Sequence, residues 1–226
     1  RKIDRWETLT YVWNEEQTEA YLKIGGKTVN TRFTDSAGKN RTVRYRVPNK
    51  NQCKECHASG DGIVPIGPKP RNLDKDFDYP DQRMNQLVKW SQMNIIDDYP
   101  QNVQPVADFT DPSKDIEARA RAYLAINCGH CHSPKGSASS TGLYLNYGEK
   151  RPKQLGILKP PVAAGRGSGG LKYSVVPGDP DASILLFRMI SDDPAIMMPE
   201  SGRSIIHQEA VALIYDWIER MEGEAR

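Results

Sequence analysis

Two stretches of the chain share one pattern: Cys53-Lys54-Glu55-Cys56-His57 and Cys128-Gly129-His130-Cys131-His132. Both read Cys-x-x-Cys-His, the attachment signature of c-type haem, and together they use all four cysteines. Two thiols three residues apart lie on one side of a turn, where they can add to the two vinyl groups of one porphyrin. The histidine that follows is then placed to bind the iron. The sequence therefore predicts two covalently attached haem c groups, one at each motif.

Three other uses of these cysteines fit the pattern less well. A thioredoxin-like redox pair stands beside a βαβ unit, of which the sequence shows no sign. A zinc site of four cysteines would leave both following histidines without a role. A disulfide framework requires neither the spacing nor the histidines. Haem also accounts for the low hydrophobic content of 38%, because each macrocycle is a large apolar filler.

Charge and hydropathy exclude two classes of partner. The formal net charge of +2 lacks the basic excess of a dedicated nucleic-acid binder, so we expect no nucleic-acid partner. The longest apolar runs, Ile184 to Phe187 and Ala210 to Ile214, are far shorter than the roughly 18 residues of a membrane-spanning helix. We therefore expect no transmembrane segment.

Residues 1–50 are predicted to form a small antiparallel β meander. Its strands are short runs rich in β-branched and aromatic residues. These runs are Tyr11 to Trp13, Tyr21 to Ile24, Lys27 to Phe33 and Arg41 to Val47. Gly25-Gly26 predicts a tight hairpin turn between two of the strands, and Asp35 to Gly38 predicts a second turn.

Residues 51–110 form the predicted first haem region, and 111–226 the second. In the first, apolar spacing predicts a helix over Asp81 to Met93, and the prolines of 97–112 predict a linker. In the second, Asp111 and Pro112 are expected to start a helix that leads into Cys128. The apolar stripe of this helix is Ile116, Ala120, Tyr123 and Leu124. A helix that ends at the haem motif is the N-terminal arrangement of a class I cytochrome c.

Two further helices are predicted near the end of the chain, one starting at Asp179-Pro180 and one at about His207. The last carries Ala210, Leu213, Ile214, Trp217 and Met221 on one face. The predicted fold is therefore mainly α, with an N-terminal β meander and two cytochrome c-like haem regions, the second class I-like.

Each iron needs a sixth ligand from elsewhere, for which a methionine sulfur or a second imidazole is the common choice. Met198 is the best-placed methionine for the His132 haem, because it lies in a loop stiffened by Pro199. A neutral sulfur favours ferrous iron, so this haem should have the higher potential. For the His57 haem, His207 ranks first, Met93 close behind and His130 third, and another chain could also supply the ligand.

The sequence resembles the secreted bacterial dihaem c-type cytochromes, and its second half is similar to cytochrome domains attached to quinoprotein sugar dehydrogenases. Four segments carry the resemblance: Tyr11 to Thr18, Val47 to His57, Val176 to Ser183, and Met198 to Ser204 with the helix after it. The resemblance implies electron transfer in the periplasm or outside the cell, haem attachment at Cys53, Cys56, Cys128 and Cys131, and iron ligation by His57, His132 and Met198.

The sequence therefore predicts an electron carrier between redox protein partners, without catalysis of its own. One alternative is a dihaem peroxidase with an open iron, for which Glu55 and Asp61 are candidate acid–base groups. The other is a self-assembling filament that conducts electrons between haems. Residues 27–54 carry eight basic side chains and one acidic, and 176–226 carry ten acidic and four basic, so head-to-tail contact between copies is possible.

Overall fold

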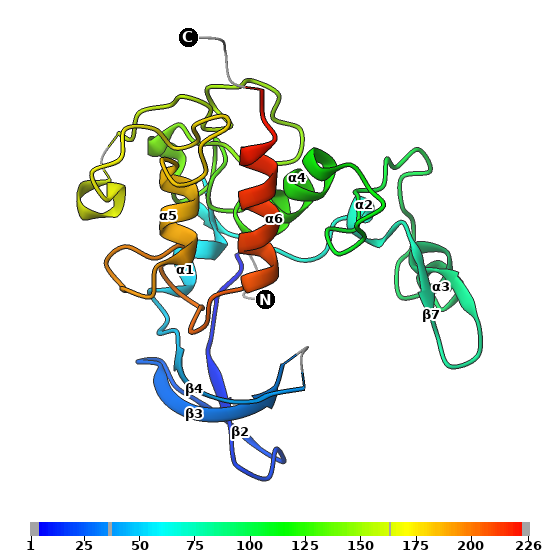
Figure 1. Cartoon of the computed structure of the whole chain (residues 1–226). Helices are drawn as coiled ribbons and strands as arrows, with labels where there is room; N and C mark the ends of the chain where they lie inside the picture. Colours follow the sequence, from blue (N-terminus) through cyan, green and yellow to red (C-terminus); the bar gives the residue numbers. More distant parts are fainter. Residues whose placement is uncertain (1–4, 36–37, 163, 223–226) are drawn as a thin grey trace.

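The computed structural model describes residues 5–35, 38–162 and 164–222. Residues 1–4 of the predicted β meander, residues 36–37 of the predicted turn at Asp35 to Gly38, and residues 163 and 223–226 of the predicted second haem region lie outside the described residues. Figure 1 shows the described elements as small helices and two-stranded sheets. The helices are α1 (Cys53–His57), α2 (Pro70–Leu73), α3 (Gln86–Gln92), α4 (Ile116–Asn127), α5 (Ile184–Ile190) and α6 (Gln208–Glu219), with 3-10 turns η1 (Ser139–Thr141) and η2 (Gly165–Ser168). The strands are β1 (Tyr11–Trp13), β2 (Ala20–Leu22), β3 (Lys27–Thr34), β4 (Asn40–Val47), β5 (Ala58–Ser59), β6 (Gly62–Ile63), β7 (Asp76–Asp78) and β8 (Arg83–Asn85).

The first part of the chain forms two separate hairpins rather than one meander. β1 pairs with β2 and β3 with β4, both antiparallel, so the predicted strands are confirmed within a few residues. The hairpin predicted at Gly25-Gly26 is wrong. Gly26 has a φ of 71°, and a Cβ there would lie 2.4 Å from the Val47 carbonyl oxygen. The chain therefore turns tightly against the end of β4 instead of pairing β2 with β3.

The helix predicted over Asp81 to Met93 begins later than the apolar spacing suggests. The β7–β8 hairpin occupies the start of this range, and α3 begins only at Gln86. The side-chain oxygen of Asn85 accepts hydrogen bonds from the backbone N–H groups of Leu87 and Val88, at 2.9 and 3.3 Å. This N-cap satisfies two donors that lack partners within the helix and so fixes its start.

α4 also begins later than predicted. Its N-cap is Asp115, whose carboxylate accepts from the backbone N–H of Ala118 at 2.8 Å. Asp111, the predicted cap, instead closes a turn by accepting from the backbone and the hydroxyl of Ser113, at 2.9 and 2.7 Å. The predicted linker before it, residues 97–112, contains neither helix nor strand. α4 still leads directly into Cys128, as the sequence predicts.

The start of α6 at His207 is confirmed, whereas α5 begins five residues after the predicted Asp179. Residues 179–183 form a turn in which the Ser183 N–H donates to the Pro180 carbonyl at 3.0 Å. No helix in the described part of the chain is long and apolar enough to cross a membrane.

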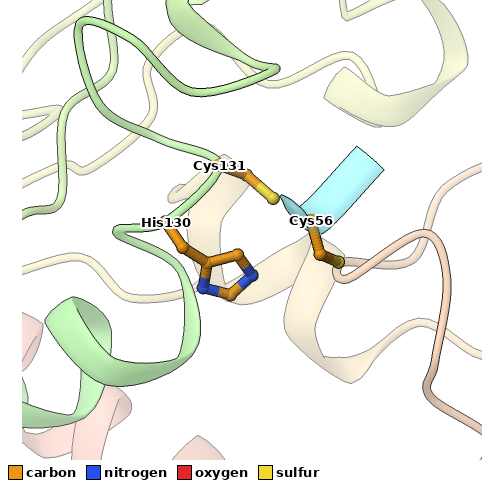
Figure 2. Close-up of side chains that lie close together, drawn as sticks. All are labelled: Cys56, His130 and Cys131. Carbon is orange, nitrogen blue, oxygen red and sulfur yellow. The ribbon is translucent and has the colours of Figure 1, made fainter. Parts of the chain in front are cut away.

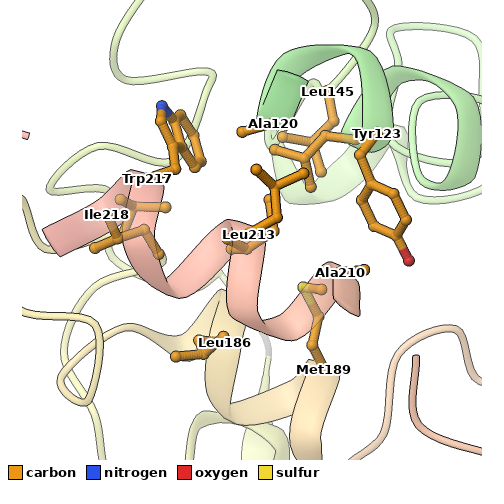
Figure 3. Packing of buried hydrophobic residues seen from close by; sticks show 12 residues of the cluster. Ala120, Tyr123, Leu145, Leu186, Met189, Ala210, Leu213, Trp217 and Ile218 are labelled. Atoms are coloured by element: carbon orange, nitrogen blue, oxygen red, sulfur yellow. The ribbon is translucent and has the colours of Figure 1, made fainter. Parts of the chain in front are cut away.

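The core lies where α4, α5 and α6 pack together, with α6 between the other two (Figure 3). Leu124 of α4 and Ile214 and Ile218 of α6 are fully buried there. The apolar stripes predicted for α4 and α6 are confirmed, because their members belong to this cluster or pack against it. This three-helix core fixes the end of α4 and with it the position of the second Cys-x-x-Cys-His motif.

A buried arginine ties the segment after the second motif to α4. Arg121 donates to the backbone carbonyls of Asn146, Tyr147 and Glu149, the last at 2.7 Å. The Glu149 carboxylate in turn accepts from Arg151, whose guanidinium lowers the pKa of Glu149 to about 2. The segment is therefore anchored at both its backbone and its side chains.

Apolar burial is distributed very unevenly along the chain. Of the sixteen buried hydrophobic side chains in the described residues, fifteen follow residue 119, and Leu87 is the exception. Of the seventeen large hydrophobic side chains that are exposed, thirteen precede residue 96. The first half of the described chain therefore lacks an apolar core of its own.

Candidate functional site

The first motif occupies α1, which neighbouring polar groups hold at its start. The side-chain oxygen of Asn49 accepts from the N–H groups of Asn51 and Gln52, both at 2.9 Å. The Thr10 hydroxyl donates to the Pro48 carbonyl at 3.1 Å, and its oxygen lies 3.7 Å from the sulfur of Cys53. The segment before β1 therefore anchors the chain where the motif begins.

His57 is prepared to bind a metal through one defined nitrogen. Its Nδ1 lies 3.0 Å from the Val64 carbonyl oxygen, which accepts the Nδ1 proton. This hydrogen bond fixes the tautomer with Nε2 unprotonated, the arrangement of a metal-ligating histidine held by a backbone carbonyl. The ring lines a small recess of about 190 Å³, together with Trp6, Ile63 and Pro65. The predicted proximal ligand thus has both an oriented ring and adjacent space.

The second motif follows the C-terminal end of α4 in a tight turn. The N–H of His132 donates to the Cys128 carbonyl at 2.9 Å, so the turn continues the helical direction for one step. A Cβ on Gly129 would lie 2.8 Å from the Ala125 carbonyl oxygen, so the backbone approaches closely there. Burial raises the pKa of Cys128 to about 12, which keeps its thiol protonated at neutral pH.

His132 is mostly buried, and its environment favours a neutral imidazole. Burial lowers the pKa of His132, and its Nδ1 is buried without a hydrogen-bond partner among the described residues. A buried polar atom without a partner costs free energy in the protein alone and calls for an explanation such as a bound group. The unprotonated imidazole that burial favours is the form that binds iron. These two features fit the predicted haem ligand.

The two motifs lie against each other although they are far apart in sequence. The Cys131 sulfur lies 2.9 Å from the Glu55 carbonyl oxygen, 76 residues earlier in the chain. The Gly60 N–H donates to the Lys135 carbonyl at 2.9 Å. The proximity of Cys131 raises the pKa of Cys56, because the Cys56 thiol shares its proton with the neighbouring sulfur. No spacing or composition in the sequence indicates this contact.

A group of three possible metal ligands forms at this contact. One ligand atom each of Cys56, His130 and Cys131 lies within 4.8 Å of the others, and Figure 2 shows the three side chains converging. A structural zinc site has four ligands, and only these three come together in the described part of the chain. Cys53 and Cys128 are not members. All four cysteines carry free thiols, as haem attachment requires.

Met198, the predicted sixth ligand of the second haem, is half-buried in the loop between α5 and α6. Its N–H donates to the Arg188 carbonyl at 3.0 Å, and the charge of Arg188 contributes to the lowered pKa of His132, after burial. The same loop reaches the first motif, because the Ser201 hydroxyl donates to the Glu55 carboxylate. The loop therefore contacts the first motif at Glu55, and it is bonded to Arg188, whose charge acts on His132 of the second motif. No pattern in the sequence predicts either relation.

Met93, His207 and Asp61 have surroundings of different kinds. Met93 is 56% exposed at the end of α3. His207 packs in a ring cluster with Phe109 and Tyr123, and its Nδ1 lies 3.3 Å from the Tyr123 hydroxyl. Asp61, named above as a candidate acid–base group, is exposed in the turn between β5 and β6.

A cleft of about 350 Å³ separates β4 from the loop after Met198. Arg44, Arg46 and Arg203 line it, with Asp192 and Glu200 on the same walls. Arg203 is already bonded to the carbonyls of Met189 and Ser191. The cleft adjoins both the first motif, through Gln52, and the loop of the predicted sulfur ligand.

Comparison of the chain with protein-family models, with curated proteins and with solved structures found no match in any of the three.

Proposed function

We propose that the protein is a dihaem c-type cytochrome that carries electrons between redox protein partners in the periplasm or outside the cell. Cys53 and Cys56 would hold one haem and Cys128 and Cys131 the other. His57 and His132 would be the proximal ligands. The haems supply reversible one-electron chemistry, and the chain orients them, limits their contact with water and tunes their potentials through ligands and burial.

The contact between the two motifs is the observation that carries this proposal. Each motif by itself is suited to attaching one haem. Because Cys56 and Cys131 are neighbours, two haems attached at these motifs would be anchored side by side. Two haems anchored in this way favour transfer of an electron from one to the other. Two of the hydrogen bonds between the motifs do not involve a thiol: the Ser137 hydroxyl donates to the Glu55 carbonyl, and the Gly60 N–H donates to the Lys135 carbonyl.

A haem count tests this proposal directly. The full chain, produced with a haem-attachment system, is expected to carry two covalent haems by pyridine haemochrome assay and intact mass. The double variants Cys53→Ser/Cys56→Ser and Cys128→Ser/Cys131→Ser are each expected to carry one. The matched control is Ser133→Ala, next to the second motif, which should keep both. A wild-type chain that emerges without covalent haem would refute the proposal.

Self-assembly into an electron-conducting filament is the second candidate function, and one observation favours it. Tyr11 and Trp13 are each more than half exposed, and they share one face of the first hairpin with Leu22, the cross-strand partner of Tyr11. Each sheet of the described residues has two strands, which leaves outer strand edges open to pairing with another chain. This apolar face with open edges is followed in sequence by the basic residues 27–54, and residues 176–226 are acidic, so the chain is suited to binding a second copy of itself.

Sedimentation and electron microscopy over a series of protein and salt concentrations test self-assembly. We expect assemblies that grow with protein concentration and dissociate in high salt. Trp13→Lys is expected to abolish them, because it places a charge in the exposed apolar face. Val162→Lys, at a side chain that is 67% exposed in the other half, is the control and should change nothing. A monomer under all conditions would rule out the filament and leave the electron carrier standing.

A further inference from the structure

We propose that His130 is the sixth ligand of the haem attached at Cys53 and Cys56, which would then be coordinated by two histidines. This inference rests on the haem attachment proposed above and assigns the ligand that the sequence left open. The first haem would thus take its second axial ligand from inside the motif of the second haem.

The position of His130 is the first argument. Its ligand atom lies within 4.8 Å of those of Cys56 and Cys131, and Figure 2 shows an edge of its ring turned toward Cys56. His57 has other neighbours, namely Val64 and the recess beside Trp6. The imidazoles of His57 and His130 therefore reach the attachment site at Cys56 from two different parts of the chain, which suits two ligands of one iron.

The backbone at Gly129 explains why His130 is directed there. A Cβ on Gly129 would lie 2.8 Å from the Ala125 carbonyl oxygen and 3.1 Å from both the Asn146 Cα and the Leu145 carbonyl oxygen. Residue 129 is therefore pressed against the segment that Arg121 anchors to α4. The next side chain, His130, lies on the side of the turn that meets the first motif.

The hydrogen bonding of His130 is the second, independent argument. The Nδ1 atom of His130 is buried and has no hydrogen-bond partner among the described residues. A buried imidazole nitrogen without a partner destabilises the protein alone, so the ring is not explained as a structural element. The ring also interacts with the Cys131 thiol and with the backbone of Ile126. Haem attachment would convert the Cys131 thiol to a thioether and so weaken the first of these two contacts.

The competing residues are engaged elsewhere. The Nδ1 of His207 lies 3.3 Å from the Tyr123 hydroxyl, and its ring meets the Phe109 ring edge to face at the exposed start of α6. Met93 is exposed at the end of α3. Of the two histidines outside the proximal positions, His130 and not His207 belongs to the group formed with a cysteine of the first motif in the described part of the chain.

Electron paramagnetic resonance of the fully oxidised His130→Ala chain tests the inference, because the substitution leaves both Cys-x-x-Cys-His patterns intact. The wild type should show one His/His and one His/Met low-spin signal. In the variant, the haem count should stay at two while the His/His signal gives way to a high-spin signal. Added imidazole should restore low spin, which a merely structural role of His130 would not produce.

His207→Ala is the matched control and should leave both low-spin signals unchanged. Retention of the His/His signal in His130→Ala would overturn the inference, as would its loss in His207→Ala. Both outcomes, with two haems still attached, leave the proposed function intact. A wild-type chain without covalent haem would instead refute the proposed function, which the haem count detects separately.

Discussion

Replacement of Met198 by alanine is expected to lower the reduction potential of the second haem, because it would remove the sulfur ligand that we propose for its iron. A thioether stabilises ferrous iron, and axial ligands set haem potentials over a range of about 0.8 V. We expect a fall on the order of 0.1 V or more, within that range. The shift should appear in a spectroelectrochemical titration, together with loss of the sulfur-to-iron charge-transfer band.

Met197 provides the matched control for this prediction. It is the same residue type one position earlier, but its side chain lines the cleft beside Arg203, and its N–H donates to the Asp193 carbonyl at 2.8 Å. Met197→Ala should therefore leave both potentials and the charge-transfer band unchanged. The same shift in both variants, or in Met197→Ala alone, would contradict ligation by Met198.

Local patterns in the sequence predict much of the second region. The apolar stripe of α6 is regular, because this helix buries one face in the core that contains Leu124 and Ile214. The stripe of α4 faces the same core, although α4 is buried on its other sides as well, from Ala120 to Leu124. Helix starts are predicted less well. Asp111-Pro112 and Asp115 are both reasonable caps, and only the packing of the following turn selects Asp115. The turn at Gly26 fails as a hairpin for a similar reason, since Val47 occupies the space beside it.

The juxtaposition of the two motifs could not be predicted from sequence. It depends on contacts between residues that are 76 to 146 positions apart, such as Cys131 with Glu55 and Ser201 with Glu55. Spacing rules describe neighbours within a turn or a hairpin and contain no information on such distant pairs. For the same reason, His130 ranks only third among the ligands that the sequence predicts for the His57 haem. Its proximity to Cys56 follows from the tertiary fold alone.

Loss of the first haem is expected to open most of the first half of the chain. Of the buried hydrophobic side chains in the described residues, only Leu87 precedes residue 120. Isolated two-stranded hairpins and helices of four to seven residues are marginal in water, and ordering each residue costs about 1–2 kcal/mol. The covalently attached haem that we propose at the first motif would be a large apolar body that offsets this cost.

Hydrogen exchange followed by mass spectrometry would measure this opening in the variant Cys53→Ser/Cys56→Ser, which keeps the second haem. Backbone amides of β1 to β4 and α1 should lose protection by roughly 100-fold or more, equivalent to about 3 kcal/mol of local stability. Amides of α4 and α6 should keep theirs, because the core around Leu124 and Ile214 does not involve the first motif. Ser133→Ala, with both haems, is the control. Unchanged protection of the hairpin amides would contradict the prediction, because contacts other than those of the first haem would then hold the hairpins. An equal loss of protection in α4 and α6 would also contradict it, because the two halves of the chain would then unfold as one cooperative unit.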